Sequence, residues 1–151
     1  MRPKDLYMIA AAALEYPSAE MRGKLAEAAE AVDDERLRQA LLLLASDDSA
    51  EAKYVELFDF SADRALYLTY HFYGDTRRRG PALAELKDAM EEAGIDLGNE
   101  LPDYLPKVLE LAAKRPDVGV PILERYRAAL EKIRRMCANT PYYEVLGAVL
   151  S

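Results

Sequence analysis

Apolar residues recur along the chain at intervals of three and four, the spacing that places them on one face of an α-helix. No stretch of four or more residues alternates cleanly between apolar and polar types, as a half-buried strand would. Glycine and proline fall mostly between the apolar stripes rather than inside them. The pattern therefore predicts an all-α bundle of about eight or nine helices.

Residues that favour helix starts and stops divide the first part of the chain. The first predicted helix covers residues 5–15 and ends at Tyr16-Pro17, because the residue before a proline disfavours helical backbone. Ser18 can cap a second helix. Two aspartates at residues 33–34 favour the positive N-terminus of a third.

Three further helix starts are assigned from residues that can act as caps. Asp48 and Glu51 have the spacing of a capping box, which predicts a fourth helix. Ser61 is predicted to cap a fifth helix that ends at Gly74. Asp103 is predicted to cap a seventh, with Pro106 at its third helical position.

The last part of the chain is predicted to contain the longest helix. The sixth helix ends at Gly94, since glycine accepts the left-handed backbone of a C-cap, and residues 95–102 form a loop. The longest helix is expected over residues 116–139. Thr140 should cap the final helix, with Pro141 in its first turn.

The amino-acid composition indicates a folded domain and argues against some classes of function. The chain has 151 residues, of which 51% are hydrophobic and 31% charged, so we expect one folded domain over residues 1–151. A net charge of −7 argues against nucleic-acid binding, which needs an excess of Lys and Arg. An acidic surface is better suited to a basic peptide.

The sequence offers little material for catalysis. It has one histidine, His71, one cysteine, Cys137, and no glycine-rich phosphate loop. We expect Cys137 to be a buried apolar residue and His71 to interact with helix carbonyls. The sequence thus predicts no enzyme activity, no metal site and no cofactor.

The N-terminus resembles a short secretory signal, because Arg2 and Lys4 precede an apolar run. Asp5 and Glu15 bracket that run. The run is also too short to cross a bilayer, which takes about 20 apolar residues. We therefore expect a buried first helix, a cytoplasmic protein and no direct membrane insertion.

Aromatic residues are unusually dense between Tyr54 and Tyr73. Tyrosine is favoured at binding surfaces because it combines a rigid apolar ring with a polar hydroxyl. Buried rings also dominate core energetics, so the cluster is equally well explained as the centre of the bundle. The cluster includes Phe58, Phe60, Tyr67, Tyr70 and Phe72.

Three adjacent arginines, Arg77, Arg78 and Arg79, require acidic partners where a helix starts. The chain is rich in acids, and arginine pairs well when it is partly buried. We favour ion pairs within the protein, with Asp59, Asp75 or Asp103 as partners. Contact with an acidic partner or a phosphate-bearing cofactor is the alternative.

Four blocks of this sequence form a distinctive series: Tyr-Val-Glu-Leu-Phe-Asp-Phe at 54–60, Leu-Tyr-Leu-Thr-Tyr at 66–70, Gly-Asp-Thr-Arg-Arg-Arg-Gly at 74–80 and Glu-Leu-Pro-Asp-Tyr-Leu-Pro at 100–106. In residues and in order they resemble the signature of NarJ-type chaperones for respiratory nitrate reductase. A weaker likeness covers nearly the whole chain.

The resemblance implies a single all-α domain of the TorD-like group, which also includes DmsD. It implies a cytoplasmic chaperone that binds the N-terminal segment of the apo catalytic (alpha) subunit of nitrate reductase. Binding would assist insertion of the molybdenum cofactor and assembly of the complex. A chaperone for a sulfoxide, chlorate or selenate reductase and a generic helical peptide-binding adaptor are the alternatives.

The expected binding surface is a groove with an aromatic floor and acidic edges. A partner helix would place apolar residues on Tyr67 and Tyr70, and basic residues against Asp59, Asp75 or Asp103. We expect a monomer, with a dimer as the alternative. The expected partner-binding residues are Phe58, Asp59, Phe60, Tyr67, Tyr70, Asp75, Arg77, Asp103 and Tyr104.

Overall fold

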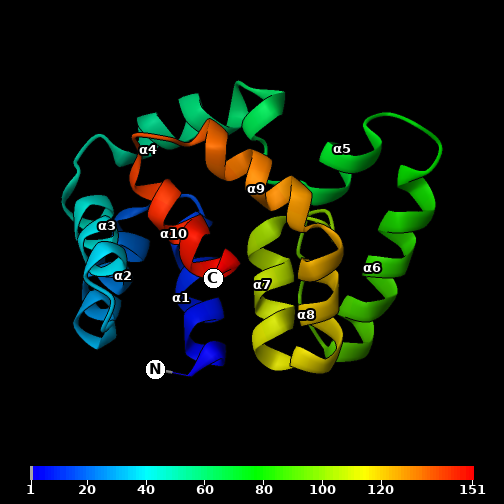
Figure 1. The fold of residues 1–151 in the computed structure, drawn as a ribbon, viewed down its shortest axis with the longest axis horizontal. Helices are drawn as coiled ribbons and strands as arrows, with labels where there is room; N and C mark the ends of the chain where they lie inside the picture. Colours follow the sequence, from blue (N-terminus) through cyan, green and yellow to red (C-terminus); the bar gives the residue numbers. More distant parts are fainter. Residues whose placement is uncertain (1) are drawn as a thin grey trace.

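The computed structural model describes residues 2–151, which form ten α-helices (Figure 1). The predicted all-α fold class is confirmed. A π-helical turn at Val55–Asp59 extends α4, and a 3-10 turn covers Ala62–Arg64. The helices are α1 (Pro3–Leu14), α2 (Ala19–Ala31), α3 (Glu35–Ser46), α4 (Ala50–Tyr54), α5 (Leu68–Tyr73), α6 (Arg79–Ala93), α7 (Leu105–Lys114), α8 (Pro116–Arg125), α9 (Arg127–Met136) and α10 (Pro141–Leu150).

The helices surround a central group formed by α1, α7 and α10 (Figure 1). The α2–α3 pair lies at one end of the molecule and α6 at the other, while α4 and α9 cross the top of the view. Helix α1 packs on α7 and α10, α3 on α10, and α8 on α7. Their apolar faces join in one buried cluster, in which leucines such as Leu14, Leu41 and Leu109 are fully enclosed.

Several helix ends lie where local sequence predicts them. Ser18 accepts a hydrogen bond from the backbone of Met21 at 3.2 Å, and Asp34 accepts one from Arg36 at 2.9 Å. Gly94 has φ +73°, the left-handed conformation expected after α6. None of the helices formed by residues 2–151 has the length and apolar character needed to cross a membrane.

The predicted capping box at Asp48 and Glu51 is wrong. Ser49 is the residue that precedes α4, and it has no side-chain cap. Asp47 accepts hydrogen bonds from the Ser49 amide at 2.9 Å and from its hydroxyl at 2.7 Å. An aspartate that bonds the backbone two residues ahead forms a turn of its own, and this turn replaces the capping box.

The predicted fifth helix is also wrong as a continuous element. Ser61 makes no cap hydrogen bond, the 3-10 turn ends at Arg64, and α5 begins only at Leu68. The intervening backbone pairs with the segment before α7. This long-range pairing overrides the local helical pattern.

The predicted long helix over residues 116–139 is divided at Tyr126 into α8 and α9. The Tyr126 amide still bonds to Ile122, and the Leu130 amide to Tyr126, both at 3.1 Å, so the division is a bend. Helix α8 packs on α7, whereas α9 packs on α5 and α10. Because α8 and α9 pack on different helices, their axes point in different directions. The continuous apolar pattern along the sequence does not reveal this change of direction.

The predicted cap at Thr140 is not formed. Its hydroxyl donates to the Cys137 carbonyl at 2.7 Å and so closes the end of α9 instead of opening α10. Pro141 occupies the first position of α10, as predicted.

Candidate functional site

The candidate site is built on two backbone segments that lie far apart in the sequence. The Leu68 amide donates to the Asp103 carbonyl at 3.1 Å, and the Leu105 amide donates to the Leu66 carbonyl at 2.8 Å. These bonds form an antiparallel bridge between Tyr67 and Tyr104. The two rings therefore lie side by side, with centroids 5.4 Å apart.

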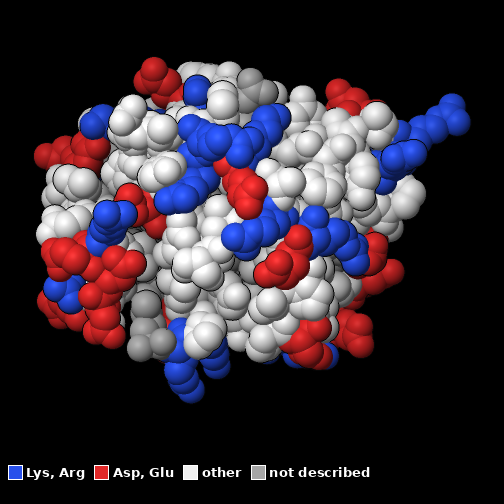
Figure 2. Space-filling model, viewed as in Figure 1, with Lys and Arg blue, Asp and Glu red and all other residues white. Residues whose placement is uncertain are grey.

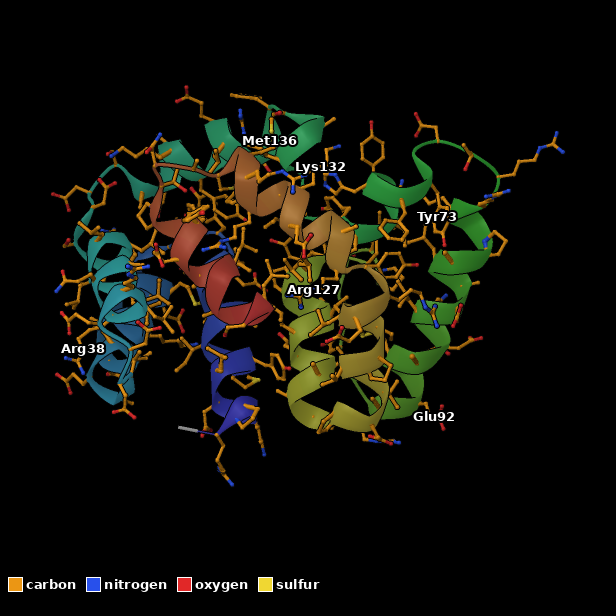
Figure 3. The ribbon with its side chains drawn as sticks, viewed as in Figure 1. Arg38, Tyr73, Glu92, Arg127, Lys132 and Met136 are labelled. Atoms are coloured by element: carbon orange, nitrogen blue, oxygen red, sulfur yellow. The ribbon has the colours of Figure 1, made fainter. Side chains whose placement is uncertain are left out.

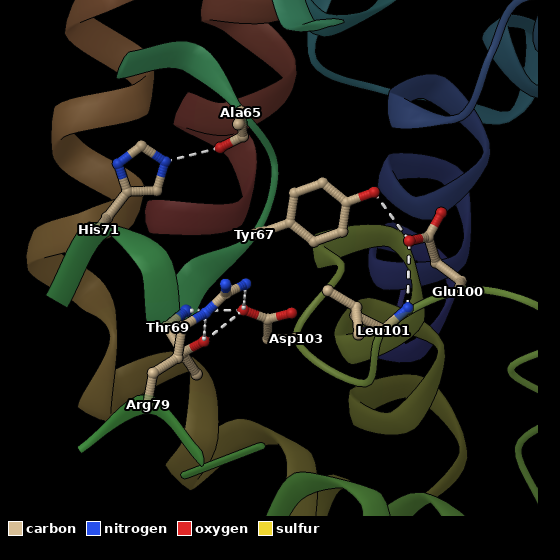
Figure 4. A network of polar contacts seen from close by, with 8 residues as sticks. All are labelled: Ala65, Tyr67, Thr69, His71, Arg79, Glu100, Leu101 and Asp103. Atoms are coloured by element: carbon tan, nitrogen blue, oxygen red, sulfur yellow. Dashed lines mark hydrogen bonds and ion pairs between the residues drawn. The ribbon is translucent and has the colours of Figure 1, made fainter. Parts of the chain in front are cut away.

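Asp103 fixes this joint from inside the protein (Figure 4). Its Oδ2 accepts from the Thr69 amide at 3.1 Å and from the Thr69 hydroxyl at 2.5 Å, and lies 3.5 Å from Arg79. The prediction that Asp103 caps α7 is wrong, since Tyr104 precedes that helix and makes no cap; Pro106 is its second residue. Asp103 is 0% exposed, so it is placed to hold the joint rather than to face a partner.

The three arginines separate into one internal and two exposed residues. Arg79 pairs with Asp103, donates to the Thr69 hydroxyl at 3.0 Å, and lies 5.7 Å from the centroid of the Tyr70 ring. The predicted internal ion pair is confirmed for this arginine. Arg77 and Arg78 are exposed on the connection between α5 and α6.

A hollow of about 200 Å³ opens beside the Tyr67–Tyr104 pair. It brings together four of the predicted binding residues from three separate parts of the chain. Most of its lining is aromatic, and two of its side chains are acidic. The lining residues are Tyr16, Tyr54, Phe58, Asp59, Leu66, Tyr67, Glu100 and Tyr104.

Hydroxyl groups around the hollow are held by hydrogen bonds. Tyr54 donates to the Leu14 carbonyl at 2.8 Å, and its oxygen lies 2.9 Å from that of Tyr104. Because the single Tyr54 proton goes to Leu14, Tyr104 is the donor between the two tyrosines. Tyr67 donates to Glu100 Oε1 at 2.8 Å (Figure 4).

The surroundings of these tyrosines disfavour the phenolate form. Burial, together with the charges of Glu15, Glu100 and Asp59, raises the pKa of Tyr104 to about 12. Burial also raises the pKa of Tyr54 and of Tyr67. All three act as neutral hydroxyls at physiological pH.

The remaining predicted residues do not line the hollow. Phe60 follows the π-helical turn and is 79% exposed, while Tyr70 is half-buried against Arg79. Asp75 and Arg77 are exposed between α5 and α6. The aromatic cluster is therefore divided, since Phe58 is buried in the core whereas Phe60 is exposed.

Sequence reasoning missed a larger groove of about 720 Å³ between the α3–α4 region and the α9–α10 joint. Leu43, which is 57% exposed, contributes to its apolar lining. So does Met136, which is 39% exposed and is labelled in Figure 3. The run of four leucines at residues 41–44 was a signal, because one helix face cannot bury all four.

Charge is unevenly distributed over the surface. Figure 2 shows Lys and Arg side chains gathered over α9, and Asp and Glu concentrated over α2 and α3. Helix α9 contributes Arg127, Lys132, Arg134 and Arg135. A basic partner would be repelled from α9 and attracted to acidic parts of the molecule.

Cys137 and His71, the two residues considered for catalysis, lie in surroundings that favour a structural role. Cys137 is fully buried, and burial raises the pKa of its thiol to about 12. His71 Nε2 lies 2.6 Å from the Ala65 carbonyl oxygen (Figure 4). Among the side chains that the structure describes, no three His, Cys, Asp or Glu residues are grouped as metal ligands.

Comparisons with known proteins agree on one family. The family model for the nitrate reductase delta subunit matches residues 15–139. A probable nitrate reductase molybdenum cofactor assembly chaperone, NarJ of Bacillus subtilis (strain 168), is 32% identical over 149 residues, which cover 91% of this chain and 81% of that protein. NarJ of Escherichia coli (strain K12) is 43% identical over 68 residues, or 44% of this chain and 29% of that protein. The nitrate reductase-like protein NarX of Mycobacterium tuberculosis (strain ATCC 25618 / H37Rv) is 34% identical over 105 residues, or 67% of this chain and 16% of that protein.

Proposed function

Since this chain belongs to the nitrate reductase delta subunit family, we propose that it is a nitrate reductase molybdenum cofactor assembly chaperone. Its partner is the catalytic subunit of nitrate reductase, and it acts in the cytoplasm without catalysing a reaction. The NarJ proteins of B. subtilis and E. coli, to which it is similar, are named for this role.

The partner's N-terminal segment docks on the surface around the Tyr67–Tyr104 pair. The observation that supports this placement most strongly is Phe60, a large ring left 79% exposed directly after Asp59, which lines the hollow. An apolar side chain from the partner would cover Phe60. Removing such a ring from water is the main source of affinity in peptide-binding surfaces.

Asp103 and Arg79 act as positioning residues for this surface. Their ion pair, together with Thr69, fixes the two segments that present Tyr67 and Tyr104. A rigid surface loses less conformational entropy when it binds, so this buried network favours affinity without touching the partner.

Isothermal titration calorimetry with the first fifteen or so residues of the host's nitrate reductase catalytic subunit tests the proposal. We expect a dissociation constant in the micromolar range or tighter, about −8 kcal/mol. A scrambled peptide of the same composition is the control. Equal affinity for both peptides would exclude a sequence-specific chaperone and favour a generic adaptor.

Substitution of one exposed apolar residue on each surface locates the docking site. Phe60→Ala should weaken binding about tenfold, because a hot-spot ring is lost. Leu43→Ala, which removes another exposed apolar side chain, this one from the larger groove, should leave affinity unchanged. The reverse result would move the docking site to that groove.

A further inference from the structure

We propose that the hollow beside the Tyr67–Tyr104 pair is a cage for one lysine or arginine side chain of the docked segment. This inference rests on the proposed function and specifies which chemical feature of the partner is recognised. The hollow combines aromatic walls with carboxylates, and its volume of about 200 Å³ is below the range typical of drug-sized ligands. One side chain, rather than a whole cofactor, fits this space.

The aromatic walls are arranged around the hollow from both sides. Tyr67 and Tyr104 form one wall, with centroids 5.4 Å apart. Tyr16 and Tyr54 meet edge to face at 5.8 Å, and Phe58 lies 4.9 Å from Tyr54. A cation close to the face of such a ring is attracted by its quadrupole, more strongly where water is excluded.

Two carboxylates are available to receive the charged group. The Tyr67 hydroxyl and the Leu101 amide both bond to Oε1 of Glu100, which orients this carboxylate and leaves its Oε2 to accept from a ligand. Asp59 is exposed on the π-helical turn and accepts no hydrogen bond from the described side chains. Hydrogen bonds between a cation and a carboxylate are about twice as strong as neutral ones.

The lining described for the hollow contains no lysine or arginine that could neutralise these acids. Lys107, the cation that influences nearby Glu15, is 3.6 Å from Glu110 and pairs with it. Glu51 adds a further negative charge at the rim through its 3.0 Å hydrogen bond from Tyr16. An apolar occupant would leave both carboxylates without a neutralising charge, whereas a cation would supply one.

Electrostatic effects on the lining tyrosines agree with a negative hollow. The charges that raise the pKa of Tyr104, beyond burial, are all carboxylates, and Asp59 also raises the pKa of Tyr54. A field that disfavours phenolate favours a bound cation for the same reason.

A double-mutant cycle between partner and protein tests the cage. Each lysine and arginine of the catalytic-subunit peptide is replaced in turn by glutamine, and each peptide is titrated calorimetrically onto four proteins. These are the unsubstituted chain, Asp59→Asn, Glu100→Gln and Glu92→Gln. Both cage substitutions preserve side-chain shape, and Glu92→Gln removes one exposed carboxylate from the far end of α6 as the matched control (Figure 3).

We expect one peptide position to lose about tenfold in affinity for the unsubstituted chain and for Glu92→Gln. The same peptide change should have a much smaller effect on Asp59→Asn and Glu100→Gln, because the carboxylate that it meets is already neutral. If the native peptide binds but no position shows this coupling, the cage is wrong and the proposed function stands. If neither the native peptide nor its variants bind, both proposals are overturned.

Discussion

Asp103 illustrates how a single buried charge can organise a surface that it does not reach. Its Oδ2 accepts hydrogen bonds from the Thr69 amide and hydroxyl and lies beside Arg79. Its backbone carbonyl accepts a hydrogen bond from the Leu68 amide. Oδ1 is buried without a hydrogen-bond partner among the described residues. Asp103 therefore leaves one carboxylate oxygen without a hydrogen bond, while the other oxygen fixes the joint between two distant segments.

Removal of this carboxylate should destabilise the protein. Asp103→Ala leaves Thr69 and Arg79 without their buried acceptor, and we expect the free energy of unfolding to fall by about 2 to 3 kcal/mol. Urea denaturation followed by circular dichroism measures the change. Asp75→Ala, at an exposed position, should change stability by less than about 0.5 kcal/mol. Equal stabilities for the two variants would show that the network does not hold the joint.

Alkaline pH should destabilise the fold, because several buried side chains hold their protons more tightly in the folded state than in the unfolded state. Burial raises the pKa of Tyr104, Tyr126 and Cys137 to about 12, from ordinary values of 10.0 for the phenols and 9.0 for the thiol. A group whose pKa is higher in the folded state stabilises that state below its unfolded pKa and loses this effect as pH rises. The free energy of unfolding should therefore be constant up to about pH 8 and decline between about pH 9 and 12. Urea titrations across this range would contradict the assignment if stability stayed level.

At the scale of helices, sequence predicts ends that depend on neighbouring residues. Ser18, Asp34 and Gly94 act through contacts within four residues, and all three predictions are confirmed. The break before α5 depends on pairing with residues 103–105, and the bend at Tyr126 depends on which helices α8 and α9 contact. Local periodicity contains no information on either partner, so both joints were missed.

The α7–α8 contact depends on a glycine. A Cβ atom at Gly119 would lie 2.4 Å from Ala112 Cα, so the two helix backbones approach more closely than a side chain allows. Gly119→Ala should lower the free energy of unfolding by about 1 to 3 kcal/mol through overpacking.

Gly23 provides the matched control, because no atom beyond its chain neighbours and the surrounding backbone of its own helix lies within 4 Å of a Cβ placed there. Gly23→Ala in exposed α2 should stabilise the protein by about 0.4 to 1 kcal/mol. Thermal unfolding of the two variants would refute the close-approach explanation if both shifted in the same direction by similar amounts.

At the scale of the molecule, the candidate site was only partly predictable. The resemblance identified Phe58, Asp59, Tyr67 and Tyr104, because they occur in recognisable blocks. Tyr54, Leu66 and Glu100 lie in the same blocks. Tyr16 lies outside the blocks and joins the hollow only after the chain folds, because the end of α1 must meet the π-helical turn and the segment before α7. Hollows of this kind arise from tertiary packing and have no local sequence signal.

Two surfaces of the folded protein are candidates for the docking site. The larger groove offers more volume and exposed Leu43, but its lining includes two basic side chains, Lys53 and Arg64, which offset the charges of Asp47 and Glu56. The smaller hollow offers aromatic walls, two carboxylates and exposed Phe60. For a basic segment, charge and ring chemistry outweigh volume, which favours the smaller site.

Hydrogen exchange measured by mass spectrometry, with and without the N-terminal peptide of the catalytic subunit, tests this central claim most directly. We expect slower amide exchange in residues 54–60, 66–70 and 100–104 at saturating peptide. Protection confined to residues 42–47 and 136–142, or no protection when calorimetry shows binding, would contradict it.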